Sequence, residues 1–245
     1  MKKQLIRIII GLMMVCLIVT PCLADESYAL SDDYLTVKEY EMADTYEELM
    51  ALAKKSTEVS DFRVEAIQDD QEIPCYVVIE KARDVIDKQT GERGTISRVT
   101  VFASDEKTRR DEGAYTTRVS IRAYFYGTLT KNSIDYHRIS KWEGRYERLD
   151  NTVSYPIRAT YSLAFGETYD GGQVGSSVWN PARAERSLSN SGQWYSLYPS
   201  WSSEYISHTG LTGQMGGTYV KINRGTSSWE LEVKITDYGL EGFEY

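Results

Sequence analysis

Hydrophobic and polar residues alternate over most of the chain from Arg63 onward, which is typical of β-strands with two unlike faces. The clearest segments are residues 115–130, 153–165 and 229–235. We expect each of these strands to bury one face and to leave the other in solvent. The apolar faces are Val119, Ile121, Ala123, Phe125 and Leu129 in the first segment, and Val153, Tyr155, Ile157, Ala159, Tyr161, Leu163 and Phe165 in the second.

Two local signals refine the strand prediction. Pro156 interrupts the second segment on its polar side, and because proline has no N–H to donate, this strand should lie at a sheet edge or carry a bulge there. Residues 218–223 and 229–235 flank Arg224 and Gly225, which predicts a hairpin.

Further strands are predicted at residues 76–83, 95–103, 134–141 and 145–149, for eight or nine in all. Short connections without helices favour antiparallel sheets over a parallel α/β arrangement. The expected fold class is therefore all-β, an antiparallel β-sandwich or barrel-like domain spanning residues 63–245, preceded by one short N-terminal α-helix.

Residues 25–62 are predicted to form an arm followed by that helix. Thr45 and Glu48 have the spacing of a capping box, in which each side chain accepts a hydrogen bond from a backbone N–H of the first turn. Leu49, Leu52 and Ala53 then share one face. We expect a helix over about residues 46–57.

The first 24 residues have the order of an export signal. Lys2, Lys3 and Arg7 precede an uncharged run over residues 8–24, and small residues precede Asp25. We expect cleavage between Ala24 and Asp25 and a secreted, extracellular mature protein of bacterial type. The alternative is a protein tethered to the membrane through an uncleaved N-terminal segment.

The charge of the mature chain restricts its partners. The whole chain has 28 Lys and Arg against 36 Asp and Glu, so loss of three basic residues with the signal leaves a net charge of −11. Such an acidic chain is unsuited to nucleic acid, and we expect no stable membrane insertion after cleavage. Cys75 is the only cysteine after residue 24, which excludes an internal disulfide in the mature chain.

Residues 166–217 break the strand pattern and are predicted to form long Gly-, Ser- and Trp-rich loops. Aromatic side chains in polar loops suit stacking on sugars or anchoring of a protein partner. The alternative is that these rings fill the core or cover its end. The candidate binding residues are Trp194, Tyr195, Tyr198, Trp201 and Tyr205. Tyr124 and Tyr126, beside Arg122, form a second candidate surface or a cross-strand ladder.

Catalytic and metal-binding motifs are missing from the sequence. His137 and His208 are the only histidines, and neither has a second ligand at a metal-binding spacing, so we expect no metal and no cofactor. No Gly-x-Ser-x-Gly string indicates a serine hydrolase. Asp69 and Asp70 are predicted to lie in a solvated turn.

Three functions remain open. We favour a secreted, non-enzymatic binding protein whose partner is a protein or a cell-envelope polysaccharide. The second is a glycan-binding protein or a glycan-active hydrolase, with Glu167, Asp170 and Glu204 as possible carboxylates. The third is an assembly component that pairs through an edge strand such as the one containing Pro156. A closed cleft with two facing carboxylates or paired histidines would favour an enzyme, and an exposed aromatic strip would favour binding. The sequence does not indicate the oligomeric state.

Overall fold

A computed structural model describes residues 34–53, 62–88, 91–107 and 114–237. They belong to one compact unit, Asp33–Tyr245, made of two antiparallel sheets packed face to face. The all-β prediction is confirmed, as is a short helix before the main strands. The predicted signal, residues 1–24, lies outside the described residues.

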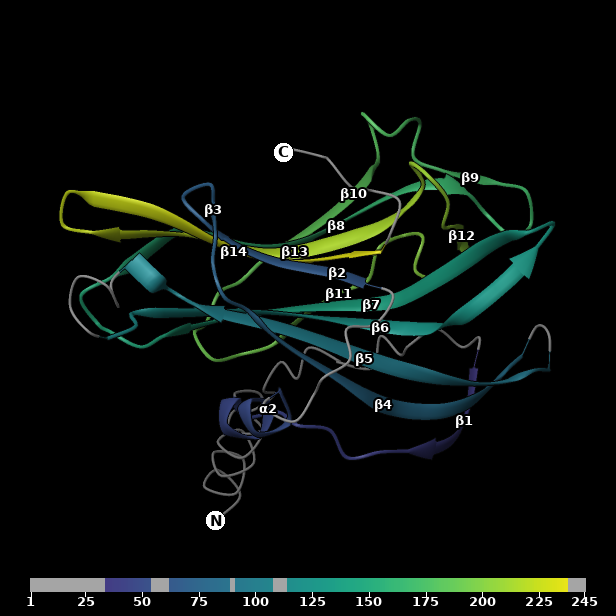
Figure 1. The fold of residues 1–245 in the computed structure, drawn as a ribbon, viewed down its shortest axis with the longest axis horizontal. Coiled ribbons are helices and arrows are strands. Elements are labelled where there is room, and N and C mark those ends of the chain that lie inside the picture. Colours follow the sequence, from purple (N-terminus) through teal and green to yellow (C-terminus); the bar gives the residue numbers. More distant parts are fainter. Residues whose placement is uncertain (1–33, 54–61, 89–90, 108–113, 238–245) are drawn as a thin grey trace, which may run out of the picture. The chain divides into compact units, whose positions relative to one another are not determined.

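Sheet A and sheet B form the two layers, with sheet B drawn above sheet A in Figure 1. Sheet A has the order β1 (Tyr34–Glu39), β4 (Tyr76–Asp87), β5 (Arg93–Ser104), β6 (Thr117–Lys131), β7 (Ile134–Arg148) and β11 (Tyr195–Leu197), and β12 (Ile206–Ser207) also pairs with β7. Sheet B has the order β10 (Ala182–Ser187), β8 (Ser154–Glu167), β13 (Gly213–Arg224), β14 (Ser227–Asp237), β2 (Phe62–Gln68) and β3 (Gln71–Glu72), and β9 (Gln173–Val174) pairs with β8.

The core between the sheets contains the apolar faces that the alternation predicts for β6 and β14. Val119, Ile121 and Ala123 face Leu231, Val233 and Ile235 within one buried cluster. The predicted hairpin is confirmed, since Arg224 pairs with Ser227 around a two-residue turn. Gly225 begins this turn with a φ of 57°, a backbone conformation that costs glycine little.

β7 is one strand, and the prediction of two strands at residues 134–141 and 145–149 is wrong. The pairing with β6 changes from Phe125 opposite Ile139 to Tyr124 opposite Lys141, which indicates a bulge at Ser140. A bulge reverses the parity of a strand, so Ile139 and Trp142 both point into the core although three positions separate them. In the sequence, the alternation of apolar and polar residues breaks at this bulge, as it does where a strand ends.

A second bulge lies at Pro156, where either a bulge or a sheet edge was expected. Lys221 pairs with Ile157 but Asn223 pairs with Ser154, so two residues of β8 oppose one residue of β13. The bulge reverses the parity of β8 beyond it, and Thr160, Ser162 and Ala164 are fully buried. The prediction that the odd-numbered residues 157–165 face the core is therefore wrong. β8 is also an internal strand, flanked by β10 and β13.

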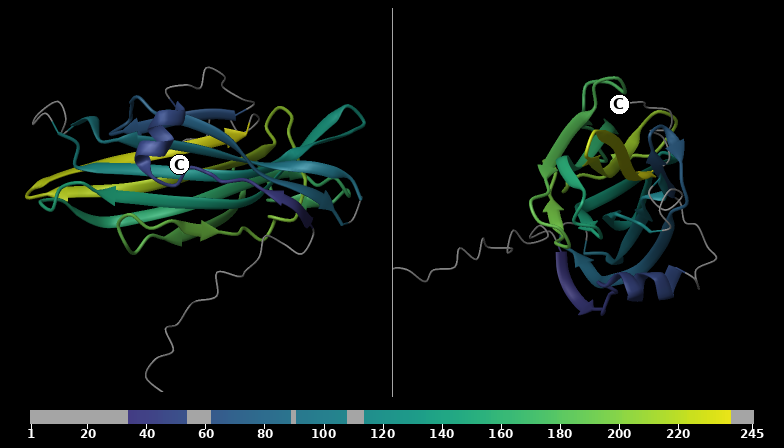
Figure 2. Two further views of the ribbon diagram at one scale, coloured as in Figure 1. Left: turned by 90° about the horizontal axis from the view of Figure 1, so that it is seen from below. Right: turned by 90° about the vertical axis from the view of Figure 1, so that its left-hand side faces the viewer.

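The outer face of sheet A is covered rather than solvated. β1 pairs with β4 at the edge of this sheet, and α2 (Tyr46–Ala53) packs on its outer side, both drawn in purple in Figure 2. Arg122, Tyr124 and Tyr126, on the side of β6 expected to meet solvent, are buried as a result. The expectation of a wet face on this strand is therefore wrong.

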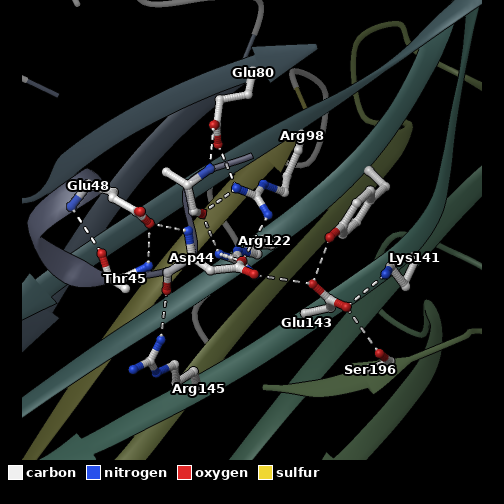
Figure 3. A network of polar contacts seen from close by, with 12 residues as sticks. Asp44, Thr45, Glu48, Glu80, Arg98, Arg122, Lys141, Glu143, Arg145 and Ser196 are labelled. Atoms are coloured by element: carbon white, nitrogen blue, oxygen red, sulfur yellow. Dashed lines mark hydrogen bonds and ion pairs between the residues drawn. The ribbon is translucent and has the colours of Figure 1, made fainter. Parts of the chain in front are cut away.

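Two buried arginines hold the segment before α2 against sheet A (Figure 3). Arg98 and Arg122 both donate hydrogen bonds to the backbone carbonyl of Ala43, and both lie within 3.4 Å of the Asp44 carboxylate. Glu80 accepts a 2.7 Å hydrogen bond from Arg98 and a 2.8 Å hydrogen bond from the N–H of Ala43. These carboxylates compensate the buried charges, as burial of arginine requires.

The predicted capping box begins α2. The Thr45 hydroxyl accepts from the N–H of Glu48 at 3.3 Å, and Glu48 accepts from the N–H groups of Thr45 and Asp44 at 3.0 Å (Figure 3). Burial of Leu49 against Val78 and Phe102 fixes the helix on the sheet. The predicted C-terminal part of this helix, residues 54–57, lies outside the described residues.

Candidate functional site

A groove with a volume of about 1320 Å³ lies on the face of sheet B turned away from sheet A. It crosses the sheet from β3 to β10. We call it the sheet B groove. Its lining residues are Arg63, Glu65, Ile67, Asp69, Asp70, Glu72, Ile157, Ala159, Tyr161, Leu163, Trp179, Arg183, Glu185, Met215, Tyr219, Glu230, Glu232, Lys234 and Thr236.

The floor of the groove is apolar because of the bulge at Pro156. Beyond it, Ile157, Tyr161 and Leu163 of β8 point outward instead of into the core. Gly217 allows the Tyr161 ring to lie close to the sheet, since an added Cβ would stand 2.6 Å from the tyrosine oxygen. The Tyr161 hydroxyl donates a 2.8 Å hydrogen bond to Glu232, which fixes the ring within the groove.

The sides of the groove carry an excess of negative charge. Seven lining residues are acidic and three are basic, a formal balance of −4. Lys234 lies 3.1 Å from Glu232, and Arg183 lies 2.8 Å from Glu185. Burial raises the pKa of Tyr219, and a hydrogen bond with Glu230 raises it further. A cationic group entering the groove would meet carboxylates on both sides.

Trp179 stands at the rim of the groove with 83% of its surface exposed. The other four tryptophans are buried or partly buried. A tryptophan this exposed is of the residue type that most often anchors a partner. It lies in the 166–217 loop region, although it was not among the predicted binding residues.

The five aromatic residues predicted to bind do not form one surface. Tyr195 lies in the main core, and Trp201 packs in a separate buried cluster with Val174 and Ile206. Trp194 covers the Arg122 guanidinium on the outer side of sheet A, 3.6 Å from its ring centroid. Tyr205 packs on Tyr126 beside Tyr34, whereas Tyr198 is exposed. Their binding role stays a prediction.

A smaller groove of about 360 Å³ brings Trp201, Glu204 and Asp170 together. Glu167, the third carboxylate considered for glycan hydrolysis, is not among its lining residues. The Thr168 hydroxyl and the N–H of Gly172 donate hydrogen bonds to Asp170, and they lower the pKa of its carboxyl group. Asp170 is thereby kept ionised, which is unfavourable for a general acid.

The two histidines meet at one end of the space between the sheets. His137 of β7 and His208, directly after β12, stack with ring centroids 4.2 Å apart. The Nδ1 atom of each lies 2.8 Å from one carboxylate oxygen of Asp237, at the end of β14. No local pattern indicated this cluster, because the two histidines are 71 positions apart and Asp237 lies 29 positions beyond His208. Neither of the two grooves described above includes them.

Two candidates remain, the Asp69–Asp70 turn, which lines part of the sheet B groove, and Cys75. Asp69 and Asp70 form the turn between β2 and β3, with φ values of 48° and 63°, as expected for a solvated two-residue turn. Cys75 is partly buried, and burial, together with Glu72, raises the pKa of its thiol.

Comparison of the chain with known protein families, with curated proteins and with solved structures found no match. None of the helices within the described ranges is long and apolar enough to cross a membrane.

Proposed function

We propose that this protein is an exported binding protein, without enzymatic activity, whose sheet B groove holds an extended polypeptide segment rich in basic and apolar residues. The observation that carries the proposal is the groove itself, with its apolar floor, acidic sides and exposed Trp179. Its volume of about 1320 Å³ exceeds the range of about 300–1,000 Å³ for small-molecule pockets, which favours a longer ligand.

Each part of the groove has a role in this proposal. An apolar side chain of the partner would cover Ile157, which is 51% exposed, and Trp179 would close over it from the rim. Basic side chains would meet Glu65, Glu185 and their acidic neighbours, which favours fast association and selects against acidic partners.

A peptide-binding assay tests the groove. Fluorescence anisotropy is measured with labelled peptides of alternating Lys and Val and of alternating Glu and Val. We expect binding of the Lys-Val peptide only, a roughly tenfold loss in Trp179→Ala, and a loss in Glu185→Lys. Glu39→Lys, the same charge change on exposed strand β1, is the control. Equal binding of the two peptides, or binding unaffected by Trp179→Ala, would overturn the proposal.

Export is proposed on the pattern of residues 1–24. The test is fractionation of the producing cell with mass spectrometry of the N-terminus. We expect a chain that begins at Asp25 outside the cytoplasm. A full-length chain in the membrane fraction would instead support the tethered alternative.

Glycan binding is the second candidate, favoured by the smaller groove that joins Trp201 to Glu204. Its test is titration with soluble peptidoglycan fragments and β-linked glucan oligosaccharides, using Glu204→Gln as the variant. Saturable binding that this variant abolishes would support a polysaccharide partner. Turnover of the oligosaccharide would revive the hydrolase alternative.

A further inference from the structure

The cluster of His137, His208 and Asp237 brings together three metal-binding side chains from three separate segments. Their ligand atoms all lie within 4.8 Å of one another. Both histidines of the chain are used here, and both Nδ1 atoms approach the same oxygen of Asp237. His137 stands on sheet A and Asp237 on sheet B, so the cluster connects the two layers.

The charge of Asp237 is the main argument for a cation. Its side chain is 1% exposed, and within the described part of the chain its only ion-pair partners are the two histidines. Its second oxygen, Oδ2, is buried and has no hydrogen-bond partner among the same residues. A buried carboxylate requires a compensating positive charge, from a protonated imidazole or from a metal ion.

Protons alone do not explain the arrangement as well as a metal does. One imidazolium would neutralise Asp237, and the second histidine would then be unnecessary. Two imidazolium rings stacked at 4.2 Å would repel each other. A divalent ion binds neutral imidazoles and an ionised carboxylate, so it uses all three side chains in favourable states.

The geometry points to a divalent transition-metal site, of which Zn²⁺ is the expected occupant, held by Nδ1 of His137, Nδ1 of His208 and the carboxylate of Asp237. Two imidazole nitrogens and one carboxylate suit Zn²⁺ and its neighbours in the first transition row, whereas Ca²⁺ and Mg²⁺ prefer oxygen ligands only.

The cluster needs little adjustment to hold the ion. Tetrahedral coordination with bonds of about 2.0–2.1 Å separates ligand atoms by roughly 3.4 Å, so each 2.8 Å contact would open by about 0.6 Å. The His208 side chain, 18% exposed, leaves the cluster accessible from solvent. The His137 backbone is held by a 3.1 Å hydrogen bond from Gln214, and Phe125 packs its ring edge-on.

Bound metal would act as a cross-link between the sheets. It would join β7 of sheet A and β14 of sheet B to the segment after β12. Since an ion that binds only the folded state stabilises it, saturation at about 100 times Kd should raise Tm by roughly 5–10 °C in a domain of this size.

Metal titration of the purified protein after chelator treatment tests the site. Isothermal titration with Zn²⁺ should give one ion per chain, and Co²⁺ should give the visible absorption of a four-coordinate complex. Mg²⁺ and Ca²⁺ should give neither. Because the chain has no other histidine, a Co²⁺ spectrum with nitrogen ligands reports on this cluster alone.

Two variants distinguish metal binding at this cluster from metal binding to carboxylates elsewhere on the protein. Asp237→Asn keeps the shape of the side chain and removes its charge, and His208→Gln changes the most exposed of the three ligands. We expect each to weaken Zn²⁺ binding at least tenfold and to abolish the rise in Tm, while Glu39→Gln, the loss of an exposed carboxylate on edge strand β1, changes neither. If Asp237→Asn fails to fold, His208→Gln decides alone. Absence of Zn²⁺ binding in the wild type, or equal binding in the wild type and His208→Gln, would overturn the proposal.

Discussion

Substitution of Glu80 by glutamine removes one negative charge from the buried network beneath α2. In the folded protein, Arg98 is 2% exposed and Glu80 is 12% exposed, and their side chains lie 2.7 Å apart. Glutamine keeps the size of the side chain and one carbonyl acceptor. The change therefore isolates the charge from the packing.

The expected cost follows from the burial of the pair. Removing one partner of a buried ion pair costs about 3–5 kcal/mol, because the other charge stays buried without compensation. Asp44 remains 3.4 Å from Arg98 and the Ala43 carbonyl still accepts from it, so we expect the lower end, about 3 kcal/mol. In a domain of this size, that corresponds to a fall in Tm of roughly 6–12 °C.

Urea denaturation followed by tryptophan fluorescence measures the effect. The matched control is Lys81→Gln on the next residue of β4, which breaks the exposed pair between Lys81 and Asp84 and should change stability little. Hydrogen exchange adds a local measurement, since the amides of residues 34–53 should exchange faster in Glu80→Gln than in the control. Equal urea midpoints for the two variants would refute the reasoning.

Three further predictions concern packing, thiol chemistry and pH. Gly216→Ala would place a Cβ 2.5 Å from the buried Trp142 ring, so we expect a loss of about 1–3 kcal/mol in urea denaturation, and a smaller loss when Trp142→Leu is already present. Cys75 should react with a disulfide reagent at pH 8 about tenfold or more slowly than free cysteine, because burial and Glu72 raise its pKa, and Glu72→Gln should speed the reaction. Burial raises the pKa of the Glu143 carboxyl, but Lys141 and the Tyr124 hydroxyl lower it more, and the net pKa lies below the ordinary 4.5. Its contribution to stability is therefore present above about pH 4.5 and lost as pH falls through the lowered value, so Glu143→Gln should flatten the acid side of the stability curve. A curve of unchanged slope would count against this role.

Local sequence patterns predicted the elements that depend on short-range interactions. The capping box at Thr45 and Glu48 identified the start of α2, because both partners lie within one turn. Alternation identified β6, β8, β13 and β14, since side-chain period is a property of a single strand. Pro156 predicted either a bulge or a sheet edge, because the missing N–H is a local defect, and the bulge is the alternative that the structure has.

The candidate sites were harder to predict, since each depends on residues far apart in the sequence. The sheet B groove exists because the bulge turns Tyr161 and Leu163 outward, and a one-residue shift of register cannot be read from alternation alone. Trp179 could have been identified as a tryptophan in a polar loop, but nothing local separates it from the buried Trp201.

The sequence by itself determined that the described part of this protein is built from antiparallel strands with one short capped helix, and it indicated an export signal. The tertiary structure alone decided which faces are buried. The polar side of β6 is covered because the chain before α2 brings Asp44 to Arg98 and Arg122. It also brought His137, His208 and Asp237 together, because sheet pairing places residues by register and not by distance along the chain.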